Sequence, residues 1–534
     1  MPSRFWTKGL SSLRAVALGL ITSGMATATA SAESTLRVAM TAADIPDWTG
    51  APDQGYEGYR FVGFSLYDSL VLWDLSSSDK AADIKPGLAE SWAIDPNDHK
   101  KWIFKLRRGV TFHDGCPWNA DSAIWNYKRV MDSSSPQYNP RHHAGQSWLI
   151  VNVSKMERVD DYTIALTTAI EDALLPYEVP GFFQISNCAV TKLNNNYDEY
   201  AKHPYGTGPY KFDKVVPHER LEVVKNADYW DKGRVPKVDR MVLLPMPEAS
   251  TRAAALLAGQ VDFVEAPSPD TIPKLKQSGM QIITVPYPHN WDYQVRADRP
   301  PFDNLKVRQA ANYAINRDEV VDMLQGVATA GYGKFIESQP YYGNPIKYTY
   351  NVEKAKALLK EAGCLPCKIT VGISTSGSGQ MQPLPMNELV KEQLEAAGFE
   401  VTLDPIDWNT LIDVYIGGAK KYPKYDAINV SLSSIEPLQG IMKSGMTRYQ
   451  TPNGFNWGLF SNAEVDKLGE AALAEFDAEK RNKIIAAMHE KLVAEAYEIF
   501  IVHDLNPRAL SPKVKGFVQA QSWFQDMTPI SVDP

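Results

Sequence analysis

The segment from Val352 to Asp407 decides the fold: it reads VEKAKALLKEAGCLPCKITVGISTSGSGQMQPLPMNELVKEQLEAAGFEVTLDPID. Residues 352–363 and 387–398 have the apolar spacing of amphipathic helices, and each run ends at a glycine, which is typical of a helix C-terminus. Residues 368–374 and 399–407 are short apolar runs typical of strands. Helices and strands that alternate at this spacing predict βαβ units, and therefore a mixed sheet covered by helices.

Patterns on both sides of this segment predict further elements. They are a strand at 35–40, an apolar helical pattern at 61–74, a strand pair within 99–115, a helix at 120–131 capped by Asn119, a strand at 162–168, a hairpin around Pro217–Arg220, a helix at 478–496 and a strand at 497–503. At about 100–200 residues per domain, a chain of 534 residues is expected to form roughly two to four domains.

The turn Gly206-Thr207-Gly208 raises the alternative of a phosphate-binding loop. Such a loop follows a strand and opens a helix, so that free backbone N–H groups face the anion. Here Pro209 follows the second glycine and has no N–H, and the alternating residues around Pro217–Arg220 predict a hairpin instead of a helix. The sequence therefore favours a turn at this position.

The N-terminus has the composition of a secretory signal peptide. Arg4, Lys8 and Arg14 give a positive start, and the apolar run AVALGLITSGM follows them. The next segment, ATATASA, ends in the cleavage pattern Ala30-Ser31-Ala32. The run is much shorter than the about 20 residues that cross a bilayer. We expect cleavage after residue 32 and a periplasmic protein, and the absence of a cysteine near this point argues against a lipoprotein.

The charge of the chain argues against two classes of partner. The formal net charge is −8 at pH 7, and loss of the basic leader makes it more negative. A chain of this charge repels nucleic acids and anionic membrane surfaces. We therefore expect no nucleic-acid partner.

The four cysteines suit an oxidising compartment. Cys364-Leu365-Pro366-Cys367 has three interpretations: a redox pair, half of a zinc site, or a local disulfide. No second pair completes a zinc site, and the motif follows a helix and precedes a strand, so a local disulfide is favoured. Cys116 and Cys188 are candidates for a second disulfide, although the sequence does not show that they meet.

No motif for metal binding, cofactor binding or nucleophilic catalysis stands out. The adjacent pair His142-His143 lacks the number of ligands that a metal needs and is expected to lie exposed in a loop. The patterns G-x-S-x-G and H-E-x-x-H are absent. We expect no cofactor and no catalytic site.

Aromatic residues are the positive feature of the composition, with 13 tryptophans and 25 tyrosines. Several lie in predicted loops, such as Trp48 in the first long loop, Trp291 in PHNWDYQ and Trp457 in TPNGFNWGLF. Aromatic side chains serve hydrophobic cores and binding surfaces alike. Their positions in loops favour a ligand-binding cleft.

Several blocks in order resemble bacterial extracellular solute-binding proteins of family 5, the peptide, nickel and glutathione-type periplasmic receptors of ABC importers. The blocks are PGLAESWAID, KKWIFKLRRGVTFHDG, NADSAIWNYKRV, GTGPYKF, NADYW, PFDNLKVRQAANYAINRDEVV, YNVEKAKALLKEAG and SNAEVDKL. They extend over nearly all of the expected mature chain. Their order is specific for the family and says little about the ligand.

The resemblance implies an α/β fold of the periplasmic-binding-protein type, with two lobes of mixed sheets around a hinge and an inserted third domain. The implied boundaries are 1–32 for the signal peptide, 33–75, 206–290 and 505–534 for a discontinuous domain I, 76–205 for the inserted domain II, and 291–504 for domain III. A solute would be enclosed between domains I and III by hinge closure and delivered to membrane permease subunits by a monomeric receptor.

One departure from the family bears on the ligand. Peptide-binding members carry an aspartate for the peptide's amino group after a strand that begins Tyr-Asp, whereas this chain has serines there, and Glu436 is the nearby carboxylate. We expect the ligand, peptide-like or not, to contact Ser433, Ser434, Glu436, Trp291 and Trp457 from domain III, and Trp48 and Tyr210 from domain I. Ordinary di- and tripeptides are expected to bind weakly, since a buried ammonium needs a carboxylate.

Two other classes of function stay open in the sequence. One is a secreted hydrolase, for which no arrangement of nucleophile and base is visible. The other is a chaperone or sensor on the same fold. A thermal shift that depends on ligand and occurs without turnover separates a receptor from an enzyme.

Overall fold

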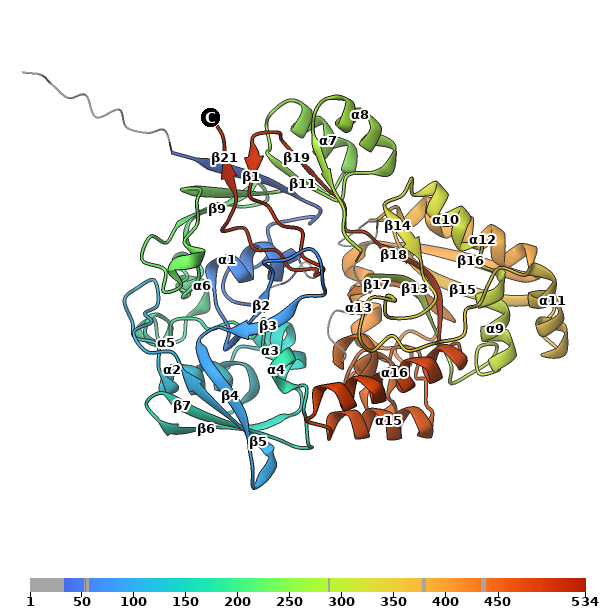
Figure 1. The fold of residues 1–534 in the computed structure, drawn as a ribbon, viewed down its shortest axis with the longest axis horizontal. Coiled ribbons are helices and arrows are strands. Elements are labelled where there is room, and N and C mark those ends of the chain that lie inside the picture. Colours follow the sequence, from blue (N-terminus) through green and yellow to red (C-terminus); the bar gives the residue numbers. More distant parts are fainter. Residues whose placement is uncertain (1–32, 52, 54–56, 287–288, 377–380, 434–437) are drawn as a thin grey trace, which may run out of the picture. The chain divides into compact units, whose positions relative to one another are not determined.

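Three β-sheets of seven, six and four strands organise the chain in the computed structural model (Figure 1). The structure describes residues 33–534 apart from 52, 54–56, 287–288, 377–380 and 434–437. Residues Ser34–Pro534 pack as one compact unit. Two strand pairs accompany the large sheets, β2 (Val71–Asp74) with β3 (Asp83–Pro86) and β20 (Val514–Lys515) with β21 (Ser531–Val532).

The seven-stranded sheet has the order β12-β19-β11-β1-β10-β9-β8 and takes strands from both ends of the chain. They are β1 (Thr35–Met40), β8 (Tyr210–Val216), β9 (Arg220–Lys225), β10 (Arg240–Pro245), β11 (Phe263–Glu265), β12 (Gln281–Ile283) and β19 (Arg508–Leu510). Strand β1 pairs in parallel with β10 and β11, whereas the other pairs are antiparallel. Strands β8 and β9 form the predicted hairpin.

The six-stranded sheet has the order β14-β18-β13-β17-β15-β16. Its strands are β13 (His289–Val295), β14 (Ala328–Ala330), β15 (Cys367–Ser374), β16 (Phe399–Ile406), β17 (Ala427–Ser433) and β18 (Glu498–Asp504). Strand β15 runs parallel to β16 and β17, while β13 is antiparallel to β17 and β18. The predicted mixed sheet with helices is confirmed, and with it the α/β class.

Local sequence explains the helices of the decisive segment. Helix α11 (Val352–Glu361) begins at Asn351, whose side chain accepts from the backbone N–H of Lys354, and buries Ala355 and Leu359. It ends before Gly363, whose φ of 69° suits a glycine. Helix α12 (Pro383–Ala396) packs on β15 and β16 and starts earlier than predicted, because a proline is favourable in the first turn.

The four-stranded sheet is antiparallel, with the order β4-β5-β7-β6. Its strands are β4 (Ala89–Asp95), β5 (Asp98–Leu106), β6 (Val153–Asp160) and β7 (Thr163–Thr168). Helix α2 (Ala120–Met131) packs on β6 and β7 and has the predicted bounds and cap, since Asn119 Oδ1 accepts from Ser122 N at 3.1 Å. The remaining α-helices of the described residues are α1 (Phe64–Leu66), α3 (Pro140–Gln146), α4 (Leu175–Glu178), α5 (Asn187–Lys192), α6 (Tyr197–Tyr200), α7 (Ala249–Leu257), α8 (Ile272–Gln277), α9 (Leu305–Ala314), α10 (Arg317–Met323), α13 (Trp408–Gly417), α14 (Lys443–Gly445), α15 (Ala463–Leu473) and α16 (Ala478–Ala494).

Two predictions in the first part of the chain are wrong. The helical pattern at 61–74 ends at Leu66, after the π-helix η1 (Gly58–Gly63) and α1, and then becomes strand β2. Strand β2 is stabilised by its antiparallel partner β3, which a local pattern does not reveal. Within 99–115 only β5 forms, followed by an isolated bridge from Thr111 to Pro117, since proline has no N–H to extend a ladder.

The pair His142-His143 lies on helix α3, and not in an exposed loop as expected. His142 is buried, with Nδ1 against the guanidinium of Arg129 and Nε2 3.3 Å from Thr49 Oγ1. Burial and the neighbouring arginine lower the pKa of His142 well below its usual range. The pair is therefore part of the packing.

The glycines at 206 and 208 permit a close approach of two backbones. Gly206 N donates to His113 Nδ1 at 3.2 Å, and Gly208 N donates to Leu66 O at 3.1 Å. A Cβ on either glycine would overlap the backbone at Leu66. Both N–H groups are used, which agrees with the predicted turn and argues against a phosphate loop.

Both candidate disulfides are bonded in the structure. Cys116 and Cys188 have a Cα–Cα distance of 6.1 Å and join the segment after β5 to α5. Cys364 and Cys367 have a Cα–Cα distance of 4.7 Å and lie between α11 and β15. Among the described residues, no helix combines the length and apolar character that a bilayer span requires.

Candidate ligand-binding site

The chain passes between the two large sheets twice, from Ile283 to His289 and from Asp504 to Arg508. The second passage lies beside the carboxyl ends of the parallel strands β1 and β11, where α/β proteins bind ligands. A cavity of about 20 Å³ lies there, lined among others by Glu265, Val327, Asp504 and Trp523. It has room for about one water molecule.

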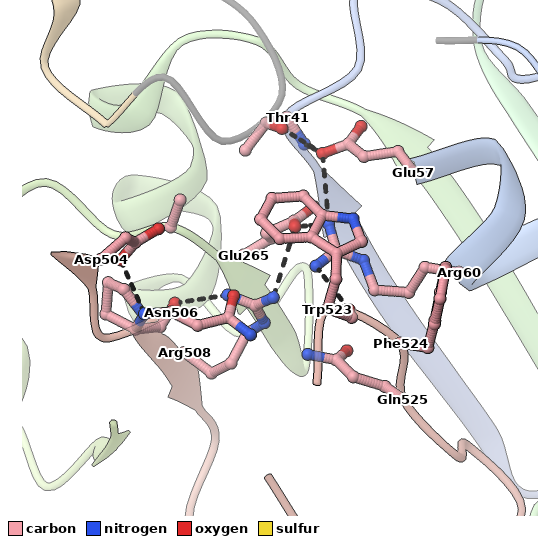
Figure 2. Close-up of polar contacts among 12 residues, drawn as sticks. Thr41, Glu57, Arg60, Glu265, Asp504, Asn506, Arg508, Trp523, Phe524 and Gln525 are labelled. Atoms are coloured by element: carbon pink, nitrogen blue, oxygen red, sulfur yellow. Dashed lines mark hydrogen bonds and ion pairs between the residues drawn. The ribbon is translucent and has the colours of Figure 1, made fainter. Parts of the chain in front are cut away.

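Two carboxylates and two guanidinium groups line the seven-stranded side of this site (Figure 2). Arg508 Nη2 lies 3.4 Å from Glu265 Oε1, and Arg60 forms an ion pair with the same carboxylate. Arg60 Nη2 is also 3.8 Å from Glu57 Oε1, which accepts from Thr41 N at 2.9 Å. All four ionisable side chains are buried. The two guanidinium groups match the two carboxylates, so the network compensates its own charge.

Burial raises the pKa of Glu57, whereas Arg60 and the hydrogen bonds from Thr41 lower it. Arg252 lies behind this network: its guanidinium donates to the carbonyl groups of Glu265 at 2.9 Å and of Met246 at 2.6 Å. These contacts hold the carboxyl ends of β10 and β11 together.

Trp523 lies between the two sides of the site. The guanidinium carbon of Arg60 is 4.4 Å from the centre of its indole ring, within cation–π distance. The imidazole of His289, the first residue of β13, is 4.5 Å away from the same ring system. One tryptophan of the C-terminal segment therefore contacts a cation of the seven-stranded side and a histidine of the six-stranded side.

The six-stranded side presents His289, Ser431 and Asp504. Ser431 Oγ lies 2.7 Å from His289 Nε2, and His289 Nδ1 lies 3.4 Å from Asp504 Oδ2. Burial lowers the pKa of His289 despite the opposing effect of Asp504, so the imidazole is neutral at pH 7. A neutral imidazole does not neutralise a carboxylate.

Asp504 is therefore the carboxylate of the site that lacks a compensating charge. It is 4% exposed, and its Oδ1 accepts from Asn506 N at 2.6 Å. Within the described part of the chain, no lysine or arginine nitrogen lies at ion-pair distance from it. Glu265, on the wall of the same cavity, has two arginines.

A second charged cluster lies deeper in the six-stranded sheet. Lys334 Nζ is 3.1 Å from Asp292 Oδ2 and 2.7 Å from Glu498 Oε2, and all three side chains are buried. Burial, and then the nearby Asp292, raise the pKa of Glu498. This cluster lies outside the cavity wall, and its position indicates a role in the stability of β13 and β18.

The predicted site residues lie in different environments. Tyr210, Trp291 and Trp457 are fully buried, with Tyr210 donating to Met527 O at 3.4 Å and Trp457 Nε1 donating to Val414 O at 3.1 Å. Trp48 is half-buried, and its Nε1 donates to Ala201 O at 2.8 Å.

Of these predicted residues, the structure brings two near the start of β13. Trp291 lies on β13, and Ser433 on β17 is the register partner of His289. Ser434 and Glu436 lie outside the described residues. Contact of any of the seven with a ligand stays a prediction.

Sequence reasoning missed Arg60, His289, Asp504 and Trp523. Arg60 and Trp523 are 463 residues apart, and no local motif marks either. His289 and Asp504 stand at the ends of strands that look like ordinary buried strands. Among the described residues there is also no group of three or more histidine, cysteine, aspartate or glutamate side chains arranged for a metal ion.

Comparison with known proteins gives the family. The model described as "Bacterial extracellular solute-binding proteins, family 5 Middle" matches residues 83–465, more than half of the chain. The chain belongs to this family. The resemblance found in the sequence is confirmed.

Individual relatives cover most of the chain. Heme-binding protein A of Haemophilus influenzae is 26% identical over 518 residues, which cover 89% of this chain and 88% of the relative. Glutathione-binding protein GsiB of Pectobacterium atrosepticum is 29% identical over 464 residues, which cover 85% of this chain and 86% of the relative. Both are named as binding proteins.

Solved structures share the fold. The periplasmic binding protein DppA from Helicobacter pylori, in complex with the peptide STSA, has a TM-score of 0.81 at 22% identity and covers 94% of this chain and 99% of its own. The dipeptide-binding protein of a Pseudoalteromonas species, in complex with Met-Leu, has a TM-score of 0.80 at 21% identity, with 93% and 100% covered. The predicted periplasmic-binding-protein-like fold is confirmed, and this chain is a solute-binding protein of the ABC importer class.

Proposed function

We propose that this protein is the periplasmic receptor of an ABC importer that captures a small organic solute carrying a cationic group, with Asp504 as the anchor of that group. The supporting observation is a buried carboxylate on the cavity wall that no lysine or arginine compensates among the described residues. A buried charge without a partner is costly, and an ammonium or guanidinium group of a ligand would remove that cost.

Entry of a solute requires the two large sheets to separate. A cavity of about 20 Å³ is far smaller than the about 300–1,000 Å³ of small-molecule sites. The passage from Asp504 on β18 to Arg508 on β19 is short, as expected of a hinge segment that connects two rigid bodies. Closure would then bring Trp523 and His289 together around the bound solute.

The three-domain division forms part of the proposal. The seven-stranded sheet uses strands from 33–75, 206–290 and 505–534, and the four-stranded sheet lies within 76–205. The six-stranded sheet falls within 291–504, apart from the first residues of β13. These assignments support domain I, the inserted domain II and domain III in the boundaries expected from the sequence.

The receptor would act by binding and closure, without covalent chemistry. Its partners would be the solute and the membrane permease subunits, and it would work as a monomer in the periplasm after removal of residues 1–32. Neither a cofactor nor a nucleic acid takes part. The remaining predicted contacts, Trp48, Tyr210, Trp291, Trp457 and the serines at 433 and 434, would surround the rest of the ligand.

Native mass spectrometry of the protein as purified from the periplasm identifies a retained ligand. Calorimetric titration then compares that ligand, or a library of di- and tripeptides, with N-acetylated forms that lack the cation. We expect the Asp504→Asn variant to lose about 10- to 100-fold in affinity for the cationic form, the effect of a charge-assisted hydrogen bond. The exposed Asp270→Asn provides the matched control and should bind like wild type.

The rival anchor is Glu436. Equal binding of acetylated and free ligands, or undiminished binding by Asp504→Asn, would contradict the role of Asp504. Loss of binding in Glu436→Gln alone would assign the cation to Glu436 instead. The same titration tests the expected weak binding of ordinary peptides, and tight peptide binding that is lost in Asp504→Asn would replace that expectation.

A further inference from the structure

A second cavity lies apart from the candidate ligand-binding site. It has a volume of about 590 Å³, within the about 300–1,000 Å³ typical of small-molecule sites. One wall is the loop from Arg107 to Gly115, which follows β5, and the other comprises Lys211 on β8 and residues from Asn226 to Lys232 after β9. The cavity thus joins the four-stranded and the seven-stranded sheets.

Cations outnumber carboxylates around this cavity. The charged residues that line it are Arg107, Arg108, Lys211, Lys232, Glu90 and Asp228. Arg107 is already engaged, because its guanidinium stacks 4.5 Å from the ring of Trp230 and lies 3.8 Å from the carboxylate of Glu90. The other charged residues of the lining are three cations, Arg108, Lys211 and Lys232, and one carboxylate, Asp228.

The three other cations, Arg108, Lys211 and Lys232, have no carboxylate at ion-pair distance in the described structure. The guanidinium carbon of Arg108 lies 4.2 Å from the centre of the Tyr162 ring, and this side chain forms no hydrogen bond or ion pair in the part of the chain that the structure describes. The chain has 63 acidic against 55 basic residues, so carboxylates are not scarce.

Other cations of the same sheet are paired. Carboxylates bind Lys214 at 3.2 Å, Arg220 at 2.8 Å, Lys225 at 3.5 Å and Arg240 at 2.6 Å. Lys211 is therefore the lysine of this sheet without a carboxylate partner among the described residues, and Arg108 and Lys232 line the same cavity. Three cations without carboxylate partners around one cavity attract an anion.

The walls of the cavity are held in place. His113 donates from its backbone N to Gly206 O at 2.8 Å and from Nε2 to Gly208 O at 3.0 Å, and its Nδ1 accepts from Gly206 N at 3.2 Å. Burial lowers the pKa of His113 to about 4, so the imidazole is neutral at pH 7. The Cys116–Cys188 disulfide follows in the same segment. A rigid frame of this kind keeps a site pre-formed.

We propose that this cavity is a second binding site, for an anion that bears phosphate groups and at least two negative charges, held by Arg108, Lys211 and Lys232. Several charges are required because three unpaired cations line the cavity and one carboxylate, Asp228, opposes the anion. Phosphate suits the set, since a guanidinium fork and two ammonium groups donate to tetrahedral oxygens from several directions. The negative net charge of the chain disfavours an anionic membrane, so a free anion is the expected source.

Pyrophosphate is the probe for the free anion. Titration at low ionic strength should show one site in the wild-type protein, and the affinity should fall as salt is added. The double variant Lys211→Gln/Lys232→Gln should lose at least about tenfold in affinity. Lys214→Gln/Lys225→Gln is the matched control, with two paired lysines of the same hairpin, and should stay within about twofold of wild type.

Vesicles of phosphatidylglycerol, with phosphatidylcholine as reference, test the other source of phosphate. Co-sedimentation that requires Lys211 and Lys232 would support the site with a lipid headgroup as its ligand. No binding of either probe by the wild type, or an equal loss in the control variant, would overturn the proposal. Binding of poly-glutamate but of neither phosphate probe would overturn it as well, and an unchanged thermal midpoint verifies that each variant is folded.

Discussion

The two sides of the candidate ligand-binding site differ in how their buried carboxylates are compensated. On the seven-stranded side, Glu57 and Glu265 are matched by Arg60 and Arg508. On the six-stranded side, Asp504 has a backbone N–H and a neutral histidine as neighbours. A self-compensated network is complete without a ligand, whereas an uncompensated carboxylate is not. We therefore assign a structural role to the seven-stranded side, and the proposed function assigns the choice of ligand to Asp504 on the six-stranded side.

The charged cluster deep in the six-stranded sheet extends this comparison. A pKa of about 8 keeps Glu498 largely protonated at pH 7, so Lys334 compensates about one negative charge of the Asp292–Glu498 pair, and the same sheet holds both kinds of buried carboxylate. If the distinction is correct, removal of a compensating group destabilises the fold strongly, and removal of the uncompensated carboxylate does not.

The largest effect is expected for Lys334→Met. The change keeps the volume but leaves the buried negative charge of the Asp292–Glu498 pair without a cation, which costs about 3–5 kcal/mol of unfolding free energy. Denaturant unfolding at pH 7 measures it. Lys347→Met removes an exposed lysine paired with Glu337 and should have nearly no effect. A similar small loss for both variants would mean that burial does not decide the contribution of these pairs.

Glu265→Gln tests the compensated network at the cavity itself. The amide fills the same space, but Arg60 and Arg508 lose their shared carboxylate, and we expect a loss of about 2–4 kcal/mol in unfolding free energy. Thermal unfolding monitored by circular dichroism gives the comparison with wild type. Stability equal to that of wild type would contradict the view that this side is held together by its ion pairs.

How much of this comparison the sequence could predict depends on the distance along the chain. Helix α2 with its Asn119 cap and helix α11 with its terminal glycine were predictable, since their signals lie within a few residues of each element. Strand β2 was not, because it depends on pairing with β3. The site depends on still more distant contacts: Glu265 and Arg508 are 243 residues apart. Local residue patterns indicated the family and, through it, a hinge. They did not indicate Asp504, because only the fold brings its neighbours together.

Buried neutral histidines provide a third test, through pH. His503 on β18 is buried beside His289, His489 and Lys334, and burial lowers its pKa from 6.5 to about 3. Because the folded-state pKa is below the unfolded value, this histidine stabilises the fold above pH 6.5, and the contribution is lost as pH falls toward 3.

For His503 alone, the loss between pH 7.5 and pH 5 is about 2 kcal/mol. The variant His503→Gln does not titrate, so its unfolding free energy should fall by about 2 kcal/mol less over this interval than that of wild type. Urea unfolding at both pH values measures the difference. Parallel pH profiles for the two proteins would show that folding does not lower the pKa of His503.

The smallest effect on stability is expected for Asp504→Asn, and this variant decides the comparison. The amide oxygen can still accept from Asn506 N, and the amide fills the same space beside His289. The change removes a buried charge that no cation of the described chain compensates, so the unfolding free energy should stay within about 1 kcal/mol of wild type or rise.

Glu265→Gln is the matched control, since it makes the same carboxylate-to-amide change on the wall of the same cavity. Denaturant unfolding of both variants gives two values to compare. If Asp504→Asn is as destabilising as Glu265→Gln, then His289 is protonated and pairs with Asp504, and the carboxylate serves the fold. If stability is kept while the affinity for a cationic solute falls, the carboxylate serves the ligand.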